Sequence, residues 1–367
     1  MKRASLQSLP VVMNHYVNDS GWRMTLSPAC FDAQCRVLAE RGWRGVSLAE
    51  AEGYLLEGEP LPPRSLLFTF DDGFLDNYFF AMPILRKHGH NGVSFPVADR
   101  IEADDAPRAE AEDVLAGSAA IPPRVRNALV TTPQGFTVRK DVFLNRGEVR
   151  AMEKSGVFQV ASHCMGHYGV FTGPEFTDFF RPRTRLRTFY RTAAEPVWGL
   201  PDFPVGPGLL HRAFIPDPEL VRRVGQLVPQ DFDGAARFFA GQGNVRALES
   251  LVRGFAARMG RFETETEQKD RMWREIGEGK ALLESILGRK VRSLCWPWGR
   301  YSGAAHEMAV DAGFSVFFVV RGGANPPGEH LAVRRFESRE MNAAWMAAQV
   351  TLHTIPFCAR LLGKAGL

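Results

Sequence analysis

No stretch of the sequence is apolar enough to cross a membrane as a helix. Such a helix needs roughly 18 or more consecutive apolar residues, and no run of that length occurs. The first ten residues carry charges but lack the apolar core of a secretory signal peptide. We therefore expect no membrane span, no export by that route and a cytoplasmic location.

The chain is also poor in cysteine, and its charges nearly cancel. The five cysteines are odd in number and show no CxxC spacing, which argues against a disulfide framework and favours reduced thiols. The 45 basic and 41 acidic residues leave a formal net charge of +4. This charge is too small for a protein that coats nucleic acid through its overall positive charge. Hydrophobic residues make up 45% of the chain, so we expect a soluble globular protein without a nucleic-acid partner.

Short apolar runs alternate with helical patterns along most of the chain. Runs without polar alternation indicate strands that are covered on both faces, as in a parallel sheet. They occupy residues 9–13, 66–70, 92–97, 157–161, 291–296, 315–320 and 331–336. Helices are expected over 28–42, with Ser27 as its cap, and over 76–88, 146–155 and 268–287. This alternation predicts an α/β fold, either a barrel or a doubly wound sheet.

Two stretches fit the alternation poorly. Residues 99–143 are rich in Ala, Asp and Pro, and we expect an excursion over the mouth of a barrel. Residues 168–267 lack strand runs and contain many prolines, which predicts a lid or small subdomain. The expected organisation is a first part of the barrel over 1–167, an insertion over 168–267, a second part over 268–340 and a helical tail over 341–367.

Two neighbouring carboxylates, Asp71 and Asp72, follow the run 66–70 and precede Gly73. Further polar or tight-turn residues follow two other runs, His163 after 157–161 and Trp298 after 291–296. In α/β barrels the carboxyl ends of the strands carry the active site. Asp-Asp-Gly is also ordinary turn chemistry, so the triplet alone does not decide between a site and a turn.

His163 and His167 are four residues apart, which places both imidazoles on one face of a helical turn. Nine histidines give one such pair by chance with an expectation of about 0.2, so a pair of surface or core histidines is the alternative. Two histidines and a carboxylate are, however, the ligand set of many hydrolytic zinc sites. We therefore expect Asp72, His163 and His167 to hold one divalent cation, with Asp71 as the general base for a metal-activated water.

Three short motifs together resemble the polysaccharide deacetylases with a NodB-homology domain. They are Thr69-Phe70-Asp71-Asp72-Gly73, His163-Cys164-Met165-Gly166-His167 and Trp296-Pro297-Trp298-Gly299, and residues 11–43 and 275–301 also look like parts of that family. The resemblance implies a distorted (β/α) barrel that binds one zinc ion and removes the acetyl group of an N-acetylated sugar. Cobalt, nickel and manganese are alternatives to zinc.

Residue by residue, the resemblance gives Asp71 as general base, Asp72, His163 and His167 as metal ligands, and the backbone N–H of Trp298 as oxyanion donor. Two positions depart from the family pattern. Cys164 stands where the family usually has Ser or Thr, and the arginine that often begins the third motif is missing. Arg335, in the last expected strand, is a candidate substitute for that arginine.

The catalytic acid of the family is commonly a late histidine in a Leu-x-His context. His353 has that context but lies in an expected terminal helix, whereas His15 ends the first expected strand and is better placed. His15 is therefore the candidate acid, with packing or hydrogen bonding inside the barrel as an equally good alternative.

The expected substrate is an N-acetylated amino sugar, and attachment of this sugar to a phosphate or lipid carrier is a further hypothesis. A carrier is suggested by five arginines that form either a phosphate clamp or, more commonly, a solvated basic face: Arg181, Arg183, Arg185, Arg187 and Arg191. The apolar helix near 343–362 is expected to pack on the barrel, with a peripheral membrane contact or a second subunit as the alternatives. Rival functions are a deformylase or cyclic amide hydrolase on the same barrel, and an inactive glycan-binding barrel. The sequence does not identify the sugar or the oligomeric state.

Overall fold

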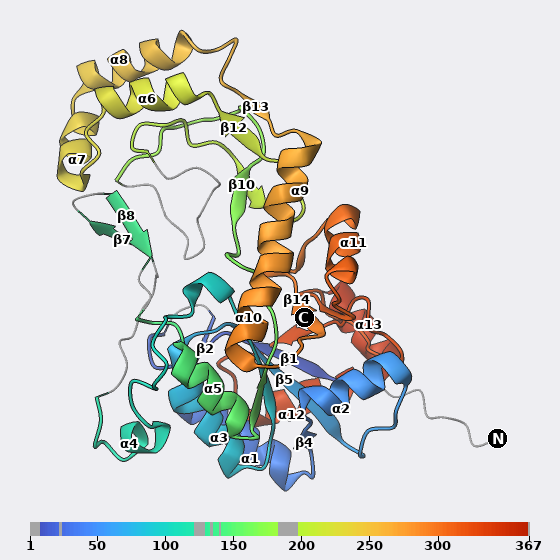
Figure 1. Ribbon diagram of the computed structural model, residues 1–367. Helices are drawn as coiled ribbons and strands as arrows, with labels where there is room; N and C mark the ends of the chain where they lie inside the picture. Colours follow the sequence, from blue (N-terminus) through green and yellow to red (C-terminus); the bar gives the residue numbers. More distant parts are fainter. Residues whose placement is uncertain are drawn as a thin grey trace.

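The computed structural model describes residues 8–21, 24–120, 129–132, 135–138, 141–182 and 197–365. A six-stranded, all-parallel sheet lies at its base, with the strand order β16-β1-β5-β6-β9 and with β4 pairing to β5 (Figure 1). The strands are β1 (Val11–Asn14), β4 (Arg44–Gly45), β5 (Ser65–Asp72), β6 (Gly92–Pro96), β9 (Phe158–Val160) and β16 (Phe336–Glu337). Every residue of β1, β5 and β6 is buried, as expected for parallel strands covered on both faces.

A second parallel pair, β14 (Ser293–Cys295) and β15 (Val316–Phe318), adjoins both edges of this sheet. Isolated bridges join Ser162 to Leu294 and Phe318 to Val333. The Cys295 N–H donates to the Ser162 carbonyl at 2.8 Å, beside β9, and the Val319 N–H donates to Val333 at 2.9 Å, just before β16. The carboxyl ends of β5, β9 and β14 are thereby brought together.

Helices cover the sheet and begin where the sequence supplies caps. The Ser27 side chain accepts from the Cys30 N–H at the start of α1, and Asn145 and Glu148 form a reciprocal capping box at α5. The helices packed around the sheets are α1 (Pro28–Glu40), α2 (Leu48–Glu52), α3 (Met82–Lys87), α4 (Ala111–Leu115), α5 (Arg146–Lys154), α9 (Glu265–Trp273), α10 (Gly279–Leu287) and α11 (Gly303–Asp311). Three π-helical turns, 53–57, 77–81 and 274–278, extend α2, lead into α3 and join α9 to α10.

All seven expected strand regions contain a strand, and all four expected helical regions are helical. Their bounds differ by a few residues, and of the last expected region, 331–336, only Phe336 lies in β16, with Val333 in an isolated bridge. The prediction of an α/β fold with a parallel sheet is confirmed.

Within the described part of residues 168–267, buried side chains from Phe171 to Met259 form a second hydrophobic core, separate from that of the sheet, while Leu209 packs into the core of the sheet. The expectation that this stretch has no strands is wrong, because short antiparallel pairs occur there: β10 (Gly169–Phe171) with β11 (Val205–Pro207), and β12 (Phe214–Pro216) with β13 (Gly260–Phe262). Three helices complete it, α6 (Pro218–Leu227), α7 (Phe232–Ala240) and α8 (Gln242–Arg253), drawn in yellow and orange at the top of Figure 1. In the stretch 99–143, which was expected to cross the barrel mouth, the described strands β7 (Leu129–Thr132) and β8 (Gly135–Val138) form a hairpin.

The carboxy-terminal segment forms two helices, α12 (Ala343–His353) and α13 (Pro356–Lys364), because Pro356 cannot continue the first one. Helix α12 packs against α1, so this part of the expected tail contacts the sheet domain. Within the described part of the chain, no helix is long and apolar enough to span a membrane. The remaining short strands, β2 (Tyr16–Val17) and β3 (Thr25–Leu26), pair beside β1.

Candidate active site

The site begins at the end of β5, where Asp71 and Asp72 occupy the last two positions of the strand. Asp72 has a φ of 72°, and Gly73 follows at 73°. A Cβ on Gly73 would lie 2.5 Å from the Cβ of Pro96, so the sharp turn requires a glycine there. A left-handed conformation is costly for an aspartate and is found most often at functional sites.

Arg335 holds Asp71 by two parallel hydrogen bonds. Its Nη1 donates to Oδ1 at 2.6 Å and its Nη2 donates to Oδ2 at 2.8 Å. Burial alone would raise the pKa of Asp71, but the charge and hydrogen bonds of Arg335 outweigh burial and hold the pKa well below its usual range. Asp71 is therefore a carboxylate at neutral pH. The expectation that Arg335 takes the place of the missing third-motif arginine agrees with this contact.

His163 and His167 lie in a loop and not on a helical turn as expected. Cys164 and His167 have φ values of 63° and 55°, which interrupt any helix. The loop nevertheless brings the two rings to a centroid distance of 5.0 Å. The idea that both imidazoles lie near one point is right, but the spacing argument for it was wrong.

The ring of His163 has a fixed orientation. Its Nδ1 lies 2.7 Å from the Cys295 carbonyl oxygen, which can only accept, so Nδ1 carries the proton. Burial alone would lower the pKa of His163, but Cys295 and the hydrogen bond to Asp72 raise it well above its ordinary value, and its Nε2 lies 3.5 Å from Oδ1 of Asp72. A backbone acceptor on the second nitrogen is the usual way in which a metal-binding histidine is oriented.

Ligand atoms of Asp72, His163 and His167 all lie within 4.8 Å of one another, and all three residues are buried. Burial, followed by the nearby His163, lowers the pKa of His167 to about 3, so its imidazole is neutral at neutral pH. One carboxylate and two imidazoles are a donor set suited to zinc, and a bound cation would take the place of the proton on Nε2 of His163. The residues present therefore fit one divalent cation.

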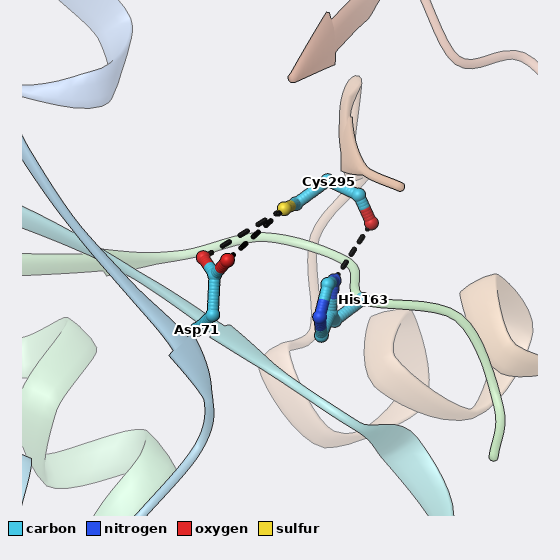
Figure 2. Close-up of side chains that lie close together, drawn as sticks. All are labelled: Asp71, His163 and Cys295. Atoms are coloured by element: carbon cyan, nitrogen blue, oxygen red, sulfur yellow. Dashed lines mark hydrogen bonds between the residues drawn. The ribbon is translucent and has the colours of Figure 1, made fainter. Parts of the chain in front are cut away.

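A second group with the same spacing consists of Asp71, His163 and Cys295. Figure 2 shows these side chains converging from three strand ends, with the Cys295 thiol 3.7 Å from each Asp71 oxygen. This group is the weaker metal candidate, because Arg335 already occupies both oxygens of Asp71. Cys295 instead completes the surroundings of Asp71, a role that no local motif indicates.

Trp298 lies in the turn after β14 with a φ of 58°. Its ring meets that of His167 edge-on at a centroid distance of 5.3 Å. Trp298 is thus adjacent to the cation ligands, and its role as backbone donor stays a prediction.

The two candidate acids are clearly separated by their positions. The Nε2 of His15 lies 3.9 Å from Oδ2 of Asp71, so His15 is part of the site. His353 is buried against Phe336, with a ring centroid distance of 4.2 Å, and its Nδ1 contacts the carbonyl of Gln349. These contacts favour His15 over His353.

One buried carboxylate near the site was missed from the sequence. Glu275, in the π-helical turn between α9 and α10, accepts a hydrogen bond from the Gly166 N–H at 3.1 Å. Its helix was predicted, but helical periodicity does not show that an acidic side chain points inward.

Most of the arginine cluster lies outside the described residues, namely Arg183, Arg185, Arg187 and Arg191. Arg181 is described and pairs with Asp178. Its guanidinium also lies 6.0 Å from the centroid of Phe239.

The sequence of residues 58–175, which contains Asp71, Asp72, His163 and His167, matches the model of one protein family, described as polysaccharide deacetylase. Over this segment the chain is similar to the polysaccharide deacetylases. The Bacillus subtilis protein YxkH is 31% identical over 93 residues, which are 25% of this chain and 33% of YxkH. The Escherichia coli poly-β-1,6-N-acetyl-D-glucosamine N-deacetylase is 25% identical over 148 residues, 40% of this chain and 19% of that protein. The deacetylase segment therefore spans a third or less of these relatives.

Solved deacetylase structures share the fold of nearly the whole chain. A de-N-acetylase from Aggregatibacter actinomycetemcomitans superposes with a TM-score of 0.60 at 17% identity, covering 93% of this chain and 99% of that one. The BpsB deacetylase domain from Bordetella bronchiseptica gives a TM-score of 0.55 at 19% identity, over 90% and 96% of the two chains. At such identities the likeness concerns the fold alone.

Proposed function

We propose that this protein is a metal-dependent hydrolase that removes an N-acetyl group from an amino sugar of a glycan or glycan precursor. The observation that carries the proposal is the convergence of Asp72, His163 and His167 beside the clamped carboxylate of Asp71. The E. coli relative is named for N-deacetylation of poly-β-1,6-N-acetyl-D-glucosamine, which supports the amide of an N-acetylated sugar as the bond that is cleaved.

Asp72, His163 and His167 would hold the cation. Zinc suits two imidazoles and a carboxylate best, with cobalt, nickel and manganese as alternatives. When bound, such a cation lowers the pKa of water and polarises a carbonyl group.

The remaining roles belong to the chain itself. Asp71, kept ionised and oriented by Arg335, accepts the proton of the attacking water. His15, on the other side of Asp71, donates a proton to the departing amine, and the Trp298 N–H stabilises the oxyanion.

The proposal is tested by measuring acetate released from N-acetylglucosamine oligomers. Asp71→Asn and His163→Ala should each abolish release, whereas Asp105→Asn, which removes an exposed carboxylate that pairs with Arg150 of α5, should retain it. Release that persists in Asp71→Asn would contradict the role of Asp71 as base.

The rival functions give different products in the same assay. A deformylase or cyclic amide hydrolase would release formate or open a ring without releasing acetate. An inactive barrel would bind the oligomers without any turnover, and it would lack a tightly bound cation.

We also infer that the strands close into a distorted barrel, with residues 168–267 as an insertion. The bridges from Ser162 to Leu294 and from Phe318 to Val333 support closure, because they join β14 and β15 to both edges of the sheet. Slow hydrogen exchange of the Cys295 and Val319 amides, at the level of the central strands, is the expected result, and fast exchange at either seam would argue for an open sheet.

Cytoplasmic location and a phosphate- or lipid-linked substrate are further parts of the proposal. Cell fractionation tests the first, and comparing free with phosphate-linked N-acetylglucosamine tests the second.

Helix α13 is the part of the carboxy-terminal segment that we propose for a peripheral membrane contact. Its Phe357 is 69% exposed, and Arg360 and Lys364 lie on the same helical face.

A further inference from the structure

We infer that Glu275 is a positioning residue that fixes the loop carrying His163 and His167, and thereby sets the affinity of the site for its cation. The inference rests on the proposed function, because Glu275 would act through a proposed ligand and not on the substrate.

Three consecutive amides of the loop are bound by this one residue. The Met165 N–H donates to the backbone carbonyl of Glu275 at 2.8 Å. The Gly166 N–H donates to its carboxylate at 3.1 Å, and the His167 N–H also donates to that carboxylate. Glu275 therefore accepts from three successive amides of the loop, whereas the Cys164 and Met165 carbonyls accept from the N–H groups of Ala98 and Asp99.

The loop needs such support because its backbone is strained. Cys164 and His167 are left-handed, with φ values of 63° and 55°, and neither is a glycine. Residues in this region persist only where their surroundings hold them there. Without the carboxylate, the amides of Gly166 and His167 would lose their acceptor, and the loop would relax away from the conformation that aims His167 at Asp72.

Glu275 is itself held on a rigid support. It is 4% exposed and lies between α9 and α10 in a π-helical turn, a feature often found at functional sites. Helix α10 touches the loop so closely that a Cβ on Gly279 would lie 2.6 Å from the Met165 nitrogen. The loop thus rests on a helix that is packed into the core through Leu283 and Ile286.

A buried carboxylate is costly to place, and an apolar side chain would fill the same space at less cost. Its acceptor oxygens are what an apolar side chain lacks. Residues that orient metal ligands in this way typically change metal affinity by roughly 10- to 100-fold when they are removed.

The test compares zinc affinity in three variants of the full chain, each stripped of metal and titrated against a competing chelator. Glu275→Met removes both acceptor oxygens at similar volume, and Glu275→Gln keeps one. Glu148→Met is the matched control, because Glu148 is equally buried and accepts the Asn145 N–H at 2.8 Å, away from the histidine loop. Circular dichroism confirms that each variant is folded at the temperature used.

We expect Glu275→Met to weaken zinc binding by roughly 10- to 100-fold, Glu275→Gln to recover most of that loss, and Glu148→Met to leave zinc affinity unchanged while lowering the melting temperature. Equal zinc affinity in Glu275→Met and Glu148→Met would overturn the inference and leave the proposed function standing. If the unmodified chain binds no zinc or other divalent cation, the proposed function and the inference both fail.

Discussion

The guanidinium of Arg335 fixes both the orientation and the charge of Asp71. It also donates through Nε to the Val319 carbonyl at 3.1 Å and through Nη1 to the Thr69 hydroxyl at 3.2 Å. Its plane is therefore set from several sides before Asp71 is bound. Because lysine cannot bind two carboxylate oxygens in one plane, the residue type is specific at this position.

Replacing Arg335 should damage activity and stability to different degrees. We expect Arg335→Lys to lower acetate release roughly 10- to 100-fold, because Asp71 keeps a nearby charge but loses its orientation. Arg335→Met should in addition lower the free energy of unfolding by about 3–5 kcal/mol, since it leaves a buried carboxylate without a partner. Urea denaturation and acetate assays on both variants check this, and full activity in Arg335→Lys would contradict it.

A His15→Gln variant separates proton donation from cation binding. We expect the turnover of N-acetylated sugars to fall roughly 100- to 10,000-fold, with unchanged zinc affinity because His15 is not among the ligands. An aryl acetate ester, whose leaving group needs no proton, should be hydrolysed almost as fast by the variant as by the unmodified chain. An equal loss on both substrates would assign His15 a packing role.

A buried histidine far from the site makes stability depend on pH. His90 accepts the Gly45 N–H on Nδ1 at 3.0 Å, and its Nε2 contacts the Cys35 carbonyl at 3.0 Å. Burial lowers the pKa of His90 below its ordinary value of 6.5. The unfolded chain therefore takes up a proton below that value while the folded chain does not, so stability is lost as the pH falls.

This loss should be measurable by urea denaturation. As the pH falls from about 7.5 to about 5.5, the unfolding free energy should decrease, because the unfolded chain takes up a proton that His90 does not take up in the folded chain. His90→Gln should show a correspondingly smaller pH dependence, whatever its absolute stability. An unchanged slope in the variant would mean that His90 takes up its proton equally well in the folded state.

Single residues of the site were visible in the sequence to different extents. Asp71, Asp72, His163 and His167 could be assigned because their motifs are local and follow apolar strands. Glu275 and Cys295 could not, because their roles depend on which loops they meet across the fold. His15 and Arg335 were only candidates, since nothing local shows that the first strand pairs with β5 and the last strand with the first.

At the level of elements, the contact between α10 and the histidine loop depends on the absence of a side chain at Gly279. A Cβ there would lie 2.6 Å from one backbone atom of the loop and 2.9 Å from another, so either the helix or the loop must move. We expect Gly279→Ala to weaken zinc binding and to lower the melting temperature.

Gly303→Ala is the matched control, because a Cβ at this first residue of α11 meets nothing within 4 Å. Alanine is the better helix former, so this variant should be neutral or more stable by up to about 1 kcal/mol. If Gly279→Ala behaves like Gly303→Ala in both assays, the close approach of α10 to the histidine loop does not affect zinc binding or stability.

The elements themselves followed from the sequence wherever apolar runs or caps were strong. Ser27 and Pro28 define the start of α1 as expected. The prediction of a helical turn for His163 and His167 is wrong because i, i+4 spacing does not require a helix. The left-handed Cys164 and His167 bring the two imidazoles equally close together from a loop. The strands β10 to β13 were missed because they are three residues long and two of them contain proline.

For the whole molecule, cation binding should be coupled to folding. The ligands come from β5 and from the loop after β9, so they converge only in the folded chain. At a free zinc concentration about 100 times the dissociation constant, the folded state should gain about 2.7 kcal/mol. Thermal melts with added zinc and with excess EDTA measure this gain, and Asp72→Ala should abolish the difference between them.

The contact between Asp71 and Arg335 joins positions that are 264 residues apart in the chain. While the protein is being synthesised, the carboxylate has no counter-charge until the 264 residues that separate it from Arg335 have followed it out of the ribosome. A nascent or truncated chain that ends before Arg335 would have to keep Asp71 protonated or exposed to water. Catalytic competence is therefore acquired late, in one step with the docking of the last strand beside the first.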